Sequence, residues 1–250
     1  MKNLKDKIVL VCGGGSGIGA ATARRLSEEG ARVAVADLNE DTALALATEC
    51  ADGKGFQYDQ ADAGSIEKLV SEVVGHFGGL DAVFANVADL GAVLEDGDLL
   101  ANGEAMWQRT LQVNVTGTAL LIKASLPYIL ERGGGSVVVT SSSASSVGEP
   151  ERVAYAASKA GVEAICRHIA SKWGKQGIRA NAIAPGLIVT PQLQAGMGQE
   201  TLDYMLRGVR GPRHGAPEDI AAAVAFLMSD DGAFVNGQVW QVNGGVDFSK

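Results

Sequence analysis

The chain has 250 residues, of which 46% are hydrophobic and 20% charged, as in an ordinary globular protein of one large domain or two small ones. Its formal net charge of −8 argues against partners such as nucleic acid or an anionic membrane surface. We expect no membrane-spanning stretch and no secretory signal, because the apolar run near the N-terminus is short. The three cysteines lack metal-ligand spacing, which favours reduced thiols in a cytoplasmic protein.

Short β-branched runs alternate with helical patterns along the first half of the chain. Strands are predicted over 8–11, 32–36, 55–58 and 82–85, and helices over 17–29, 40–49 and 65–77. This alternation predicts βαβ units, and therefore a parallel sheet with helices on both faces.

The second half continues the same rhythm. A long helix is predicted over 103–131, a strand over 136–140, a helix over 152–175 and a strand over 178–183. A last helix begins at Pro217, and a last strand covers 238–242. Residues 185–215 show only weak helical periodicity, so we expect a mobile excursion there, with a substrate lid over about 187–215. The predicted fold is a single α/β domain over 1–250, a Rossmann-like doubly wound parallel sheet of about seven strands.

A glycine-rich turn, Gly13-Gly14-Gly15-Ser16-Gly17-Ile18-Gly19, lies between the first predicted strand and helix. Glycines there permit a tight turn and let the backbone approach a pyrophosphate, and the helix N-terminus supplies N–H donors. Asp37 ends the second strand, where a carboxylate can bind the adenosine ribose and repel a 2′-phosphate. Because neither Ser16 nor Leu38 is basic, the sequence favours NAD(H) over NADP.

Tyr155 and Lys159 are four residues apart on a predicted helix, so the phenol and the ammonium lie on one face. A free tyrosine has a pKa near 10, and a cation beside it favours the phenolate. We therefore expect Lys159 to lower the pKa of Tyr155 into the range of a working base. The pair alone is weak evidence, since long helices contain this spacing by accident.

Taken in order, these motifs resemble the short-chain dehydrogenase/reductase family over nearly the whole chain. Further matches are Asn114-Val-Thr-Gly117, Pro185 to Thr190, and the segment from Asn236 to Gly245. The resemblance implies catalytic roles for Asn114, Ser142, Tyr155 and Lys159. It implies a cofactor site made of Gly13, Ser16, Gly17, Ile18, Gly19, Asp37, Leu38, Asp59, Gln60, Asn86, Val87, Ala88, Tyr155, Lys159, Pro185, Gly186, Ile188 and Thr190.

The chain departs from the family pattern in three places. The family's Asn-Asn-Ala-Gly segment is Ala85-Asn86-Val87-Ala88 here, which puts a methyl group where the backbone runs close to the cofactor. Cys12 stands where the family has a threonine. Residues 89–103 form a segment a few residues longer than usual, which suggests an altered wall at the substrate mouth.

The resemblance also implies a mechanism. Tyr155 takes the alcohol proton as hydride leaves for the nicotinamide, Ser142 holds the same oxygen, and Lys159 binds the nicotinamide ribose. Asn114 supports a water that passes protons on from Lys159. None of the three histidines lies in a metal-ligand pattern, so no metal site is predicted.

The substrate and the assembly are less determined. An apolar lid with polar ends suits a secondary alcohol or ketone on an alicyclic or hydroxysteroid-like skeleton. The charged residues around the lid, which include Glu149, Arg152 and the lid arginines, could instead bind an anionic group of the substrate or remain solvated. The alternatives are a 3-oxoacyl-thioester reductase and a catalytically silent dinucleotide-binding protein. Relatives usually form tetramers, so a homotetramer is expected. Alanines such as Ala156, Ala157, Ala160 and Ala164 allow close helix packing, but burial inside one subunit explains them equally well.

Overall fold

The computed structural model describes residues 1–248 and contains a sheet of seven strands, each parallel to its neighbours. The strands are β1 (Ile8–Cys12), β2 (Arg32–Asp37), β3 (Gly53–Gln57), β4 (Ala82–Ala85), β5 (Gly135–Thr140), β6 (Ile178–Pro185) and β7 (Val239–Val242). Their order is β3-β2-β1-β4-β5-β6-β7, so the winding reverses between β1 and β4. This confirms the predicted doubly wound fold. The last two residues of the domain predicted over 1–250 lie outside the described residues.

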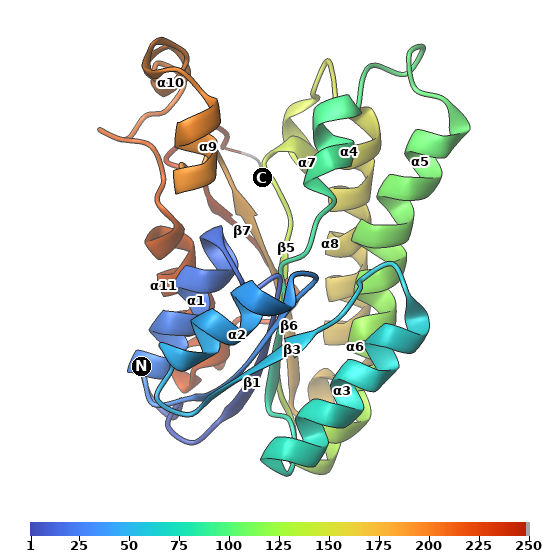
Figure 1. Cartoon of the computed structure of the whole chain (residues 1–250), viewed down its shortest axis with the longest axis vertical. Coiled ribbons are helices and arrows are strands. Elements are labelled where there is room, and N and C mark those ends of the chain that lie inside the picture. Colours follow the sequence, from blue (N-terminus) through green and yellow to red (C-terminus); the bar gives the residue numbers. More distant parts are fainter. Residues whose placement is uncertain (249–250) are drawn as a thin grey trace.

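Helices cover both faces of the sheet (Figure 1). One face carries α1 (Gly17–Glu28), α2 (Glu40–Thr48) and α11 (Pro217–Met228), and the other carries α3 (Ala63–Phe77), α6 (Thr118–Glu131) and α8 (Val153–Trp173). Successive strand residues point to opposite faces. Val9 and Val11 of β1 therefore join the core beneath the first group, and Ile8 and Leu10 join the core beneath the second. Burial on both faces explains why this strand is apolar throughout.

The helix predicted over 103–131 consists of three parts. These are α5 (Glu104–Leu111), the π-helix η1 (Gln112–Gly117) and α6. The π-turn contains Asn114, which is buried, and a methyl group on Gly117 would lie only 2.2 Å from the Gln60 carbonyl oxygen. The combined stretch Glu104–Glu131 reaches the length and the apolar character of a membrane span, by length and composition only. Its residues Leu121 and Leu126 pack in the core, so packing accounts for its apolar character.

Several short helices were not predicted. The segment 89–103 contains α4 (Leu90–Glu95), whose first turn is capped by the Asp89 carboxylate at the Ala92 N–H, 2.8 Å away. The segment expected to be an irregular excursion contains α9 (Pro191–Gly196) and α10 (Gln199–Leu206), and the Thr190 hydroxyl caps α9. The serine-rich loop after β5 forms α7 (Ala144–Val147). Such helices are too short to show a clear hydrophobic period, and α4 and α9 are organised by local capping side chains.

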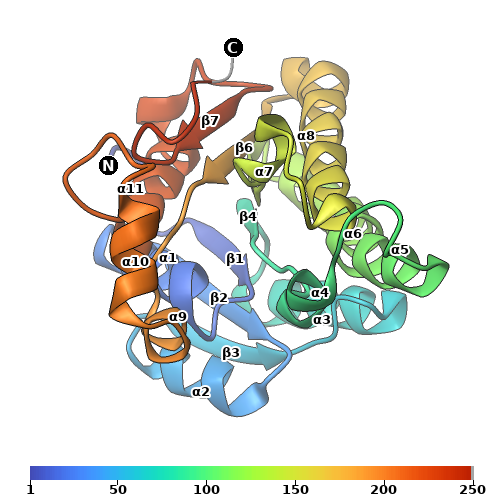
Figure 2. The same ribbon diagram turned by 90° about the horizontal axis from the view of Figure 1, so that it is seen from above.

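These short helices gather at one end of the molecule. Figure 2, which looks down on this end, shows α9 and α10 on one side and α4 and α7 on the other. The carboxyl ends of β1 and β4 point to the same end, at the place where the winding reverses. In doubly wound sheets, ligands bind beyond the carboxyl ends of the strands at this position.

At the opposite end, one buried carboxylate ties the beginnings of the strands together. Asp81 is 4% exposed, and its Oδ2 accepts the Ile8 N–H at 2.8 Å. Its Oδ1 accepts from Arg132 Nε at 2.8 Å and from Lys7 Nζ at 3.4 Å. Removing the carboxylate leaves a buried N–H without its partner, a loss that costs free energy.

We predict that Asp81→Ala lowers the free energy of unfolding by about 2–3 kcal/mol, because a buried, charge-assisted acceptor is lost. Asp52→Ala is the matched control, since its ion pair with Arg32 is largely exposed and contributes at most about 1 kcal/mol. Urea unfolding of both variants measures the difference. Equal losses in the two variants would contradict the structural role of Asp81.

Candidate active site

The glycine-rich turn joins β1 to α1 in a conformation that few other residues could adopt. Gly13 has φ 68°, and a methyl group on Gly19 would lie 1.9 Å from the Gly13 carbonyl oxygen. Ser16 is the N-cap of α1 but makes no side-chain capping bond, and the first turn of α1 contains no acidic residue. The helix start therefore suits an anion, which is what a pyrophosphate requires.

Asp37 ends β2 beside this turn. Its Oδ2 accepts the Gly15 N–H at 2.9 Å, and its Oδ1 accepts the Asn39 N–H at 3.1 Å. Leu38 follows with 66% of its surface exposed, a large apolar side chain left open at the rim. A fixed carboxylate next to an open apolar surface fits the adenosine half of a dinucleotide, and a 2′-phosphate would meet the negative charge of Asp37.

Asp59 and Gln60 follow β3 and have different surroundings. Asp59 Oδ1 accepts the Ala61 N–H at 2.8 Å, so the carboxylate shapes a turn before α3. The Gln60 side chain is buried, where it accepts from the Tyr58 hydroxyl at 2.9 Å and donates to Thr118 Oγ1 at 3.3 Å. Only the backbone of Gln60 is therefore available to a cofactor.

At the end of β4, Asn86 connects the glycine turn with β5. Its Nδ2 donates to the Gly13 carbonyl at 3.4 Å, and its Oδ1 accepts from the Thr140 hydroxyl at 2.8 Å. Val87 Cγ2 would lie 3.2 Å from a methyl group on Gly13, so Val87 borders the turn directly. The half-buried Ala88 follows. The segment thus keeps the polar contact expected of Asn86 despite its departure from the family pattern.

Tyr155 and Lys159 lie one turn apart on α8, as predicted. Lys159 Nζ is 5.6 Å from the centroid of the Tyr155 ring and donates to the Thr140 carbonyl at 2.8 Å. The Lys159 side chain is buried, and burial lowers its pKa to about 8. A cation is therefore held against the tyrosine ring by one backbone oxygen in a poorly solvated place.

The expectation that Tyr155 has a lowered pKa is wrong for this structure. Burial raises the pKa of the phenol and outweighs the other effects on it. A hydrogen bond with Ser142 and the charge of Arg152 act in the opposite direction, and the charge of Glu149 adds to the rise. Tyr155 is a protonated phenol here, because desolvation disfavours the phenolate.

Ser142 lies in the loop between β5 and α7, where its hydroxyl accepts the Ala144 N–H at 3.2 Å and acts to lower the pKa of the Tyr155 phenol. The loop is fixed by Glu163, whose Oε1 accepts from the hydroxyls of Ser141 and Ser145, both at 2.6 Å. Ser143 donates its N–H and its hydroxyl to the Pro185 carbonyl at 3.0 and 3.1 Å. Ser142 is thus held in place by the residues on either side of it.

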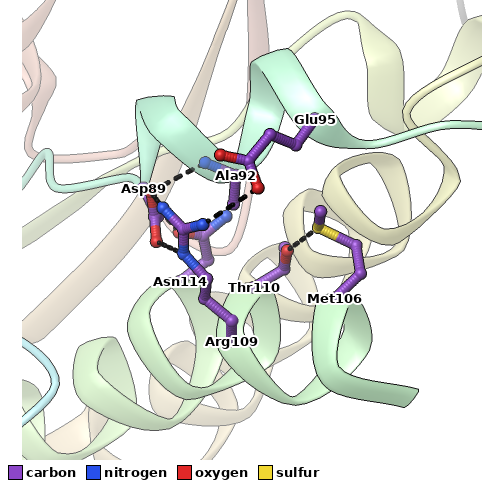
Figure 3. A network of polar contacts seen from close by, with 7 residues as sticks. All are labelled: Asp89, Ala92, Glu95, Met106, Arg109, Thr110 and Asn114. Atoms are coloured by element: carbon purple, nitrogen blue, oxygen red, sulfur yellow. Dashed lines mark hydrogen bonds and ion pairs between the residues drawn. The ribbon is translucent and has the colours of Figure 1, made fainter. Parts of the chain in front are cut away.

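Asn114 joins this cluster from the π-turn of η1. Its Nδ2 donates to Ser158 Oγ at 3.0 Å, and Ser158 Oγ donates to the Tyr155 carbonyl at 2.7 Å. Its Oδ1 accepts the Asp89 N–H at 3.1 Å. Figure 3 shows this contact beside the ion pair of Asp89 with Arg109, whose two bonds measure 2.7 and 2.9 Å. The Asn114 side chain is therefore fully engaged in orienting its neighbours.

The segment from Pro185 to Thr190 passes from the end of β6 to the lid. A methyl group on Gly186 would meet Asn243 at 3.0 Å, and one on Gly17 would meet Thr190 Cγ2 at 3.2 Å. The segment therefore runs close to the start of α1. Ile188 is different, since its side chain is 9% exposed and packs in the core. Only its backbone can face a cofactor.

Sequence reasoning missed two residues of the site. Thr140 acts through its carbonyl oxygen, which any residue type would supply, so no sequence signal exists for it. Glu163 lies four residues after Lys159, on the same helical face, and this spacing could have revealed it. All four predicted catalytic residues, Asn114, Ser142, Tyr155 and Lys159, come together at the carboxyl end of the sheet.

Comparison with known proteins agrees with this geometry. The family model described as enoyl-(acyl carrier protein) reductase matches residues 13–247. A probable short-chain type dehydrogenase/reductase of Bradyrhizobium diazoefficiens is 37% identical over 98% of this chain and 89% of its own length. A 2,5-dichloro-2,5-cyclohexadiene-1,4-diol dehydrogenase of Sphingobium indicum is 37% identical over 98% of each chain.

A solved structure is similar as well. The crystal structure of gox2181 superposes with a TM-score of 0.89 at 29% sequence identity, covering 97% of this chain and 96% of that one. Fold, motif order and sequence matches all extend over nearly the whole chain. The chain belongs to the short-chain dehydrogenase/reductase family, whose members use a nicotinamide dinucleotide as cofactor.

Proposed function

We propose that this protein is an NAD-dependent oxidoreductase that interconverts a secondary alcohol and a ketone on an alicyclic or hydroxysteroid-like skeleton. The observation that carries the proposal is the cluster of Ser142, Tyr155 and Lys159 at the carboxyl end of the sheet. There a phenol lies near a serine hydroxyl that favours its ionised form and is packed against a buried ammonium. The diol dehydrogenase among the relatives supports a cyclic alcohol as substrate.

The chemistry divides between the cofactor and the side chains. When bound, NAD supplies the hydride acceptor at its nicotinamide ring. Ser142 and Tyr155 hold the alcohol oxygen, and Tyr155 takes its proton after its own phenol proton has left along the path described below. Lys159 keeps a positive charge beside the phenol, and with the positive nicotinamide ring of bound NAD it would favour the phenolate that accepts this proton. Asn114 holds the first turn of α8 through Ser158 and belongs to the proposed path by which protons leave Lys159.

Charges near the lid have partners within the chain. Arg213 forms two hydrogen bonds with Asp219 at 2.6 and 2.8 Å, and Arg152 pairs with Glu149. The Arg207 guanidinium lies over the Tyr204 ring, 5.8 Å from its centroid. The pairing of Arg213 and Arg152 with carboxylates supports a neutral substrate, because no anion is required to balance these two cations.

One alternative is a 3-oxoacyl-thioester reductase, which shares an acyl-thioester substrate with the enoyl-(acyl carrier protein) reductase of the family model's description, although that name refers to reduction of a carbon–carbon double bond. Against it stands Asp37, whose carboxylate is fixed beside the glycine turn where the 2′-phosphate of NADP would be repelled. A catalytically silent dinucleotide-binding protein is the other alternative. The joint presence of Asn114, Ser142, Tyr155 and Lys159 in one cluster argues against it.

The homotetramer and the cytoplasmic location are also part of the proposal. Ala157, Ala160 and Ala164 of α8 are exposed, so burial inside one subunit does not explain these small residues, and their exposure supports packing of α8 against another copy. Cys12, Cys50 and Cys166 are free and buried, which suits a reducing compartment.

We predict that Tyr155→Phe abolishes oxidation of cyclic alcohols and hydroxysteroids, because the proton acceptor is lost while the ring remains. NADH absorbance measures turnover, and NADH fluorescence measures cofactor binding, which is expected to be nearly unchanged. Tyr204→Phe, at an exposed tyrosine of α10, is the matched control and retains activity. Turnover by Tyr155→Phe at the parent rate would refute the assigned base.

We predict that the parent enzyme prefers NAD and that Asp37→Ala narrows the ratio of kcat/KM for NAD over NADP by about tenfold or more, a change of about 1.4 kcal/mol. The physical reason is the removal of a fixed negative charge from the site of the 2′-phosphate. Asp41→Ala, which removes an exposed charge from α2, leaves the ratio unchanged. Equal kcat/KM values for both cofactors in the parent would contradict the proposal.

The lowered pKa of Lys159 has a consequence for stability. Between pH 8 and the pKa of a lysine in the unfolded chain, Lys159 is protonated in the unfolded state and largely neutral in the folded state. The free energy of unfolding of the cofactor-free protein therefore increases as pH rises through this range. Below pH 8 its destabilising effect is fully present. We predict that Lys159→Met abolishes turnover and also removes this increase in stability with pH. The measurement is the unfolding free energy of the parent minus that of the variant, which is expected to increase from pH 7 to 10. A difference that stays constant with pH would show that the ammonium is not desolvated.

A further inference from the structure

Helix α8, which carries Tyr155 and Lys159, begins without a cap of its own. Its N-cap residue, Arg152, has left-handed backbone angles of φ 61° and ψ 41° and makes no side-chain capping bond. The Arg152 guanidinium pairs with Glu149 instead. The first N–H groups of a helix have no intrahelical acceptors, so those of α8 need partners from another part of the chain.

These partners come from the end of α4, nearly sixty residues earlier. The Tyr155 N–H donates to Asp96 Oδ2 at 2.7 Å, and the Ala154 N–H lies 3.4 Å from Asp96 Oδ1. The Val153 N–H donates to the Gly97 carbonyl at 3.4 Å. A carboxylate at a helix N-terminus also interacts favourably with the helix dipole. Asp96 therefore accepts hydrogen bonds from the free N–H groups at the start of α8, as an N-cap side chain usually does.

Asp96 is itself held firmly. It is 6% exposed, and its Oδ1 also accepts from Asn102 Nδ2 at 2.5 Å. Asn102 Oδ1 in turn accepts the Gly97 N–H at 2.9 Å, which closes the turn after α4. At the other end of the same segment, the Asp89 N–H holds Asn114. The longer segment 89–103 thus contacts two of the four predicted catalytic residues through hydrogen bonds.

We propose that Asp96 is a positioning residue that sets the place of the Tyr155 phenol for proton transfer. Its carboxylate binds the main-chain N–H of Tyr155 itself, so loss of the bond frees the residue that carries the phenol. Small displacements of a reacting group reduce rates strongly. The inference rests on the proposed function, since it assigns Asp96 to the reaction in which Tyr155 takes part.

The test compares Asp96→Ala, Asp96→Asn and the control Asp98→Asn. Asp98 is exposed, and within residues 1–248 its carboxylate bonds only to the N–H groups of Leu100 and Ala101 in its own loop, so its variant removes the same charge two residues away. Turnover of a cyclic alcohol is divided by the number of NADH-binding sites measured by fluorescence. The KM and the primary deuterium isotope effect on kcat are measured alongside.

Asp96→Ala is expected to lower kcat per NADH site by about 10- to 100-fold, with little change in KM or NADH affinity and a larger isotope effect. Asp96→Asn keeps one acceptor oxygen for the Tyr155 N–H and recovers part of the rate. If Asp96→Ala does not fold, the smaller loss in Asp96→Asn carries the test. Asp98→Asn retains the parent kcat.

Three results would overturn the proposal. They are an unchanged kcat per NADH site in both Asp96 variants, a loss of activity only in proportion to lost NADH sites, and an equal loss in Asp98→Asn. Amide hydrogen exchange separates this outcome from failure of the proposed function. If the parent oxidises no alcohol, the proposed function fails. Faster amide exchange confined to the first turn of α8 in Asp96→Ala would still support the anchoring of Tyr155 by Asp96. Unchanged exchange in that turn would refute the anchoring.

Discussion

The site depends on keeping one ammonium group out of water beside a phenol. Lys159 is buried, with the Thr140 carbonyl as its acceptor and the Tyr155 ring as its neighbour. Removing a charge from water costs free energy, and this is why burial lowers the pKa of Lys159. The surrounding structure must therefore hold the helix, the strand end and the serine loop together. Much of the polar bonding around the site serves this purpose.

The fold supplies the rigid parts of this arrangement. The end of β5 provides Thr140, and the end of β4 provides Asn86, which links Thr140 to the glycine turn. Helix α8 presents Tyr155 and Lys159, and Glu163 on the same helix fixes the serines on either side of Ser142. A single network thus runs from the turn suited to a pyrophosphate to the phenol that we propose as the base.

Most of this could be predicted from the sequence, because the signals are local. Apolar runs of β1 and β2 alternate with helical patterns, and the glycine turn, Asp37 and the Tyr155–Lys159 spacing are short motifs. The structure therefore confirms the doubly wound parallel sheet and brings the four predicted catalytic residues together. The orientation of single side chains is not a local property. Gln60 and Ile188 turn their side chains into the interior, which depends on packing partners far away in sequence, so that their backbones remain available to a cofactor.

The remaining differences have physical reasons. The α4, α9 and α10 helices are short, and α4 and α9 begin at capping side chains, so they leave weak periodicity in the sequence. The bond between Asp96 and Tyr155 joins residues nearly sixty positions apart, which no local pattern can reveal. The raised pKa of Tyr155 arises from burial, and burial at a single position depends on the whole fold.

The central claim is that Tyr155 is protonated when the site is empty and becomes a usable base when NAD occupies it beside Lys159. The most direct measurement is a pH titration of phenolate absorbance, taken as the difference between the parent and a variant without this phenol, with and without saturating NAD. The account predicts an apparent pKa of Tyr155 above the ordinary tyrosine value in the free protein and a clearly lower one with NAD bound. A pKa that stays equally high with NAD present would contradict it.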